Sequence, residues 1–156
     1  MSLRANPRSP PENPMEILLP DGWPRPSGYS NGIRVPAGRD LVFIAGMVGW
    51  DESERIVSTD FVDQFEQAVR NVRAVLERGG GTPDDLVRVT VYVADAAQYT
   101  RRRAEVGQAW RRVLGLTFPT MSLVEVSRLL EDGALVEVEA TAAVAASGSG
   151  SAAPGT

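Results

Sequence analysis

Apolar residues recur every three or four positions along one stretch in the first half of the chain, at Val62, Phe65, Val69, Val72 and Leu76. This spacing places them on one face of an amphipathic α-helix. Asp60 stands before the stretch as a candidate N-cap, and three glycines from Gly79 onward follow it as a stop signal. The pattern predicts a helix between these two signals.

A second amphipathic stretch lies further along the chain, with apolar residues at Tyr99, Val106, Trp110 and Val113. Asp95 precedes it as a candidate cap, and Gly115 follows it. These signals predict one continuous second helix between the two capping positions.

Two other segments alternate with a period of two residues, which predicts β-strands with two different faces. In the segment 86–93 the valines at 87, 89, 91 and 93 form the core face, and the opposite face carries Leu86, Arg88, Thr90 and Tyr92. In the segment 135–144 the core face consists of Val136, Val138, Ala140 and Ala142, and the opposite face of Leu135, Glu137, Glu139 and Thr141.

Two further segments are predicted as strands with less regular patterns. Residues 41–48 form a continuous apolar run, which is typical of a strand buried on both faces. Residues 33–35 are expected to pair with this run across the turn at 36–40. Residues 121–126 form another strand, and Met121, Leu123 and Glu125 face away from the helices if Val124 and Val126 face them.

The resulting order, β-β-α-β-α-β-β, predicts an α+β fold with two helices on one face of a mixed sheet. The other sheet face would be half apolar and half charged, and the pattern leaves open whether it is solvated or forms a subunit interface. We expect a single domain over residues 17–145. Residues 1–16 and 146–156 are rich in Pro, Ser, Gly or Ala and are expected to be a disordered segment and a flexible tail.

Composition narrows the chemistry that the chain can perform. It has 156 residues with no histidine and no cysteine, which excludes disulfides, a histidine base and a thiol nucleophile. The usual zinc ligands are absent, and we expect neither a metal nor a cofactor. The net charge of −4 argues against nucleic acid as a partner. No apolar run is long enough for a membrane span or a signal peptide, so we expect a cytoplasmic location.

Several motifs resemble those of the RidA/YjgF family, whose members also carry the description L-PSP endoribonuclease. Residues 119–126, followed by 135–140, resemble the C-terminal signature of that family. The tripeptide at 28–30, the run at 41–46 and the helix segment at 67–72 resemble three further family segments. The resemblance covers residues 28–144.

The resemblance implies a chorismate-mutase-like fold, a homotrimer and small-molecule clefts between subunits, lined by the open sheet face. In active family members a glutamate that matches Glu137 positions the water that hydrolyses an imine or enamine. The resemblance also places Tyr29, Leu123 and the backbone at Gly46 and Met47 around the ligand.

One position departs from the family pattern. Two residues after Pro119, where most members carry an arginine that clamps a substrate carboxylate, this chain has Met121. A thioether offers no bidentate hydrogen bonds to a carboxylate, so the usual clamp is missing. Arg103 and Arg88 are candidates to replace it, and the alternative for both is an ordinary surface arginine.

The sequence therefore supports more than one function. The first is a divergent hydrolase of the deaminase type, which acts on C–N bonds in an enamine, imine or related small metabolite. The second is a non-catalytic small-molecule-binding or accessory protein on the same fold. A third, an RNA-cleaving or translation-inhibiting protein, draws on the arginine run at 101–103, but the acidic charge and the lack of histidine argue against it. The ligand itself is not identified by the sequence.

Overall fold

The structure is a computed structural model and describes residues 14–146. In chain order the elements are β1 (Glu16–Leu18), β2 (Gly32–Arg34), β3 (Arg39–Val48), α1 (Phe61–Arg78), a short 3-10 helix (Pro83–Asp85), β4 (Leu86–Val93), α2 (Ala96–Arg101), α3 (Arg103–Leu114), β5 (Thr120–Glu125) and β6 (Val136–Ala145). Most of the two predicted terminal segments, 1–13 and 147–156, lies outside the described residues. Within the described range, no helix has the length and hydrophobicity that a membrane span requires.

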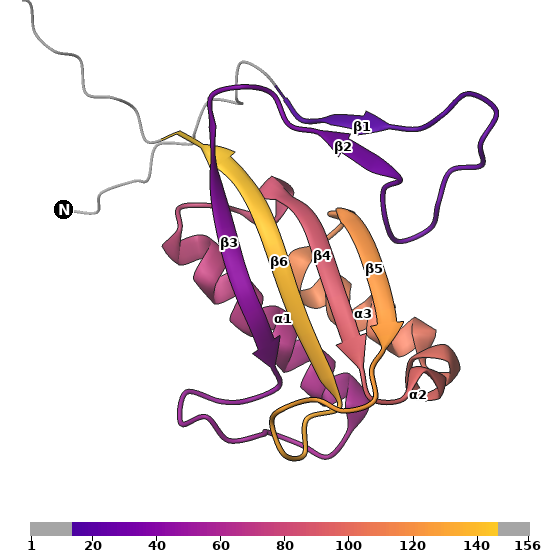
Figure 1. The fold of residues 1–156 in the computed structure, drawn as a ribbon, viewed down its shortest axis with the longest axis vertical. Helices are drawn as coiled ribbons and strands as arrows, with labels where there is room; N and C mark the ends of the chain where they lie inside the picture. The colour runs from indigo at the N-terminus through magenta and orange to yellow at the C-terminus, as the bar shows by residue number, and fades with distance from the viewer. Residues whose placement is uncertain (1–13, 147–156) are drawn as a thin grey trace, which may run out of the picture.

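A four-stranded mixed sheet in the order β3-β6-β4-β5 organises the fold. β6 runs antiparallel to both β3 and β4, and β5 runs parallel to β4. The helices lie together behind the sheet in Figure 1, so its other face is left open. The predicted α+β architecture, with helices on one face only, is confirmed.

The predicted helix ends are also confirmed. The carboxylate of Asp60 accepts hydrogen bonds from the backbone of Val62 and Asp63 at the start of α1, and Gly79 ends that helix. Asp95 caps α2 in the same way, and Gly115 ends α3 with a φ of 72°, which favours glycine. The predicted apolar faces of α1 and α3 are buried against the inward valines of β4 and β6.

The second predicted helix is interrupted, contrary to the expectation of one continuous helix. Arg102 leaves the helical conformation, with φ −120° and ψ 26°, and separates α2 from α3. Its guanidinium is bound by Asp60, at the start of α1, and by Glu105. These tertiary bonds compensate for the break, and the local apolar spacing gave no sign of it.

Three strand predictions need correction. Residues 32–34 pair with β1 as a separate two-stranded hairpin, not with β3. Leu86 lies in the core because a register shift between Leu86 and Arg88 interrupts the alternation of β4. β3 is an edge strand and is not buried on both faces: the side chains of Leu41 and Phe43 are 57% and 75% exposed in the protomer.

The phase of β5 is the correction that matters most for function. Met121 and Leu123 pair with Val89 and Val91 of β4, whose side chains lie in the core. Since paired residues of neighbouring strands point to the same face, both side chains face the helices, and they pack against the core. Val124 is the residue of this strand that is exposed on the open face.

Candidate functional site

Glu137 lies on the open face of the sheet, where the alternation of β6 predicts it. Its neighbours on either side, Val136 and Val138, are buried in the core. The carboxylate folds over Gly46 on β3: a Cβ atom built at Gly46 would lie only 1.9 Å from Oε1 of Glu137. Gly46 belongs to a register shift between Ile44 and Met47. The bare glycine backbone is therefore what leaves room for this carboxylate.

Other polar groups surround Glu137 on the same face. The hydroxyl of Tyr92 donates a hydrogen bond of 2.8 Å to Glu139, and this bond raises the pKa of the tyrosine above its ordinary value. Glu137 raises this pKa as well, whereas the nearby Arg88 lowers it. Arg88 pairs with Thr141 of β6, which lies on the same face as Glu137, so Arg88 belongs to the open face.

Four of the other predicted residues lie on the opposite side of the sheet from Glu137. Tyr29, Arg103, Met121 and Leu123 line one cavity of about 1050 Å³ beside β5. The floor of the cavity includes the core side chains Phe65, Val91 and Trp110. The structure therefore brings Arg103 to the cavity of Met121 and places Arg88 elsewhere.

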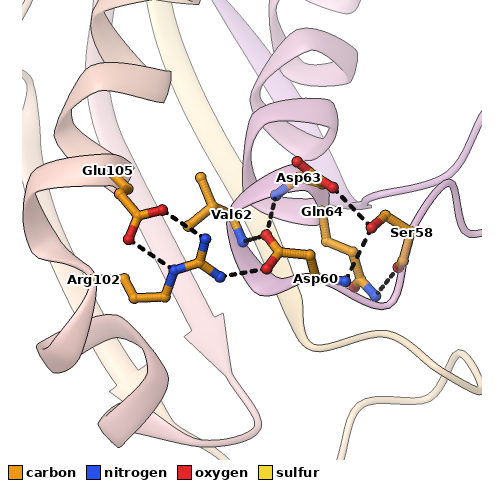
Figure 2. Close-up of polar contacts among 7 residues, drawn as sticks. All are labelled: Ser58, Asp60, Val62, Asp63, Gln64, Arg102 and Glu105. Atoms are coloured by element: carbon orange, nitrogen blue, oxygen red, sulfur yellow. Dashed lines mark hydrogen bonds and ion pairs between the residues drawn. The ribbon is translucent and has the colours of Figure 1, made fainter.

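Hydrogen bonds of the neighbouring residues position Tyr29 and the start of α3, both of which border this cavity. Ser30 donates hydrogen bonds to the carbonyls of Pro119 and Phe118, which fastens the neighbouring Tyr29 beside the start of β5. Figure 2 shows Arg102 held between Asp60 and Glu105. Its fixed conformation sets where α3 begins.

The same contacts affect the ionisation of Asp60 and Glu105 and distinguish Arg102 from its neighbour Arg103. Hydrogen bonding to Arg102 holds the pKa of the Asp60 and Glu105 carboxyls below their ordinary values. Arg102 is therefore bound within the fold. Its neighbour Arg103 forms no ion pair within residues 14–146 and lies over the ring of Tyr99, 5.9 Å from its centroid.

Within one protomer the predicted site is thus divided into two parts. Glu137 and Gly46 lie on the open face, whereas Met121 and Leu123 face the helices. The expectation that Met121 and Leu123 would be neighbours of Glu137 is wrong, because β5 has the opposite phase. Met47 pairs with Val138 and packs toward the core, so its side chain lies away from Glu137.

Several cavity residues were missed from the sequence. Arg25, Gly107 and Arg111 line the cavity beside Arg103. A helical spacing of four connects three of these positions, 103, 107 and 111, and that spacing could have revealed a shared helix face. Arg25 comes from the loop between β1 and β2, and no pattern predicts its position. No three acidic side chains of the described range come together as a metal site.

Comparisons with known proteins agree with this architecture. A sequence model of the family described as Endoribonuclease L-PSP matches residues 24–144. A RutC family protein from Pyrococcus abyssi is 34% identical over 129 residues, which cover 81% of this chain and 95% of the relative. The 2-iminobutanoate/2-iminopropanoate deaminase of Salmonella typhimurium is 33% identical over 102 residues, 65% of this chain and 78% of that protein.

Solved structures give the same result. A conserved Rid-family protein from Yersinia pestis superimposes with a TM-score of 0.73 at 29% identity, over 83% of this chain and 98% of that one. The YjgF gene product of Escherichia coli is 31% identical with a TM-score of 0.59, over 75% and 88% of the two chains. The chain belongs to the RidA/YjgF family.

Proposed function

We propose that the protein is a divergent RidA-like hydrolase, a homotrimer that removes ammonia from an imine or enamine in a cleft between subunits. The observation that carries the proposal is the division of the candidate site between two faces of one sheet. A carboxylate at a bare glycine lies on one face and a ligand-sized cavity on the other. Two neighbouring copies would bring these two parts together.

The open face supports such an assembly. Leu41 and Phe43 on β3 and Val124 on β5 leave large apolar side chains exposed on the two outer strands of the sheet that carries Glu137. A surface that mixes exposed apolar side chains with polar groups is typical of protein interfaces. The structurally similar proteins belong to the same family, for which the resemblance implies a trimer.

In the proposed reaction Glu137 accepts a proton from water while the water oxygen bonds to the imine carbon. The C=N π electrons move to nitrogen, which takes the proton back from the carboxyl group. The hydroxyl proton of this intermediate then passes through Glu137 to the amino nitrogen. The C–N bond breaks, C=O forms and ammonia leaves, so that atoms and charges balance. Gly46 would keep the carboxylate in place for both transfers.

The test is ammonia release by freshly generated imines. We expect the small acids 2-iminopropanoate and 2-iminobutanoate to be poor substrates, because the cavity is much larger than they are and they would leave most of its apolar lining uncovered. Imines with a larger apolar body should be hydrolysed faster. Glu137→Gln should abolish release, because an amide keeps the shape but cannot accept the proton.

Glu139→Gln is the matched control, because Glu139 lies on the same face of β6 and binds Tyr92. It should retain ammonia release per folded trimer. Equal losses in both variants would indicate a structural role for Glu137. Ligand binding without release of ammonia from any imine would favour the alternative, a non-catalytic binding protein.

A further inference from the structure

One face of α3 borders the cavity beside β5 through three residues spaced four apart. Arg103, Gly107 and Arg111 all line this cavity. A rise of 1.5 Å per residue separates the backbone positions of the two arginines by about 12 Å along the helix. Between them the helix is bare, since a Cβ atom at Gly107 would meet no heavy atom within 4 Å. The face therefore presents two cations with an open space between them.

The charge of the cavity is one-sided. Arg25 joins Arg103 and Arg111 in the lining, which includes no Asp or Glu. None of these three arginines forms an ion pair within residues 14–146. By contrast, Arg102 and Arg112 on the same helical segment are bound by carboxylates. Unpaired cations around a concave apolar surface create a positive potential that attracts anions.

Apart from Ser27 and Gln108, the rest of the lining is mainly apolar and aromatic. Trp110, Phe118 and Leu123 contribute to it together with Met121. The volume of about 1050 Å³ is slightly above the roughly 300–1,000 Å³ typical of pockets for drug-sized ligands. A carboxylate of three or four carbons would leave most of this surface uncovered. The lining thus combines an anion-binding rim with an apolar interior.

We propose that this cavity binds an organic anion with an apolar, ring-sized body, and that Arg103 is the main partner of its acid group. The inference rests on the site of the proposed function and gives its ligand class. The apolar body lies over Met121 and Leu123, in the space that Gly107 leaves open.

Calorimetry on the full chain tests the charge requirement with four probes: phenylacetate, phenylacetamide, acetate and phenyl phosphate. We expect phenylacetate to bind at least about tenfold more tightly than its neutral amide, because hydrogen bonds to a charged group are the strong ones. Acetate should bind more weakly than phenylacetate, because it lacks the apolar body. Phenyl phosphate shows whether the preferred acid group is a phosphate or a carboxylate. Equal affinities for the acid and the amide would overturn the inference.

Two pairs of variants test the assigned residues. Arg103→Ala should weaken phenylacetate binding about tenfold or more, whereas Arg101→Ala, which removes an exposed arginine outside the lining, should not. Gly107→Phe should weaken binding, because its ring would occupy the space beside Gly107 where the apolar body of the ligand lies, whereas Ala74→Phe, at an exposed position of α1 outside the lining, should not. Light scattering on each variant checks that assembly is the same. Equal losses in Arg101→Ala and Arg103→Ala, or full binding by Gly107→Phe, would refute the assignment.

The outcome can be separated from that of the proposed hydrolase. Selective binding of phenylacetate without ammonia release from any imine would reject the hydrolase and retain the anion site. Turnover of imines, combined with equal binding of phenylacetate and phenylacetamide, would retain the hydrolase and reject the anion site.

Discussion

The contact between Gly46 and Glu137 allows the proposed role of the carboxylate to be tested by a single methyl group. In Gly46→Ala the new Cβ would lie 1.9 Å from Oε1 of Glu137 and 2.8 Å from its Cδ. Non-bonded heavy atoms need about 3.5 Å, so the carboxylate oxygen must move by about 1.5 Å. The atoms that must move are the end of a flexible side chain, so we expect the fold to remain. Misplacing a catalytic group by about 1 Å can cost on the order of 100-fold in rate.

The assay is ammonia release with the best imine substrate, combined with a crystal structure of the variant. Glu139→Gln is the control, because it changes a neighbouring carboxylate on the same face of β6 and adds no atom at Gly46. It should retain activity. Wild-type rates in Gly46→Ala, with the carboxylate visibly displaced, would refute the role of Glu137. An undisplaced carboxylate would refute the steric reasoning.

Three further predictions concern assembly and stability. Phe43→Glu should dissociate the proposed trimer, because it places a charge at an apolar position of the open face. Leu130→Glu should leave the assembly intact even though Leu130 is 89% exposed, and light scattering distinguishes these results. Gln64→Leu should lower the free energy of unfolding by about 3 kcal/mol or more in urea titrations, because the fully buried amide makes three hydrogen bonds to the backbone; an unchanged urea midpoint would contradict this. Hydrogen bonds to arginine lower the pKa of the Asp60 and Glu66 carboxyls from 3.8 and 4.5. The stability that these two ionised carboxylates contribute is fully present above their ordinary pKa values and is lost as the pH falls through their lower pKa values in the folded protein. The urea midpoint should therefore decrease in acid. The acid-induced decrease of the urea midpoint should be smaller in Glu66→Gln than in the wild-type protein. Equal decreases in the two proteins would argue against the carboxylate–arginine contacts of Glu66 as the cause.

The helices and the central strands could be predicted because their signals are local. The caps at Asp60 and Asp95 and the stop at Gly115 depend on residues within one turn, and the structure has them where the sequence indicates. The position of Glu137 on the open face follows from the period of β6 in the same way. The break at Arg102 could not be predicted, because its partner Asp60 is 42 residues away in the sequence.

By itself, the sequence determined the family, the α+β class and the face of β6 on which Glu137 lies. It also determined that no histidine or cysteine takes part in the chemistry and that position 121 lacks an arginine. Only the tertiary structure decided the phase of β5, because Met121, Leu123 and Val124 are all apolar and fit either face until the pairing with β4 is known. That pairing divides the candidate site between two faces of the sheet. Arg103 and Arg111 share one face of α3, whereas Arg25 comes from the loop between β1 and β2, so only the packing of these two segments brings all three arginines to one cavity.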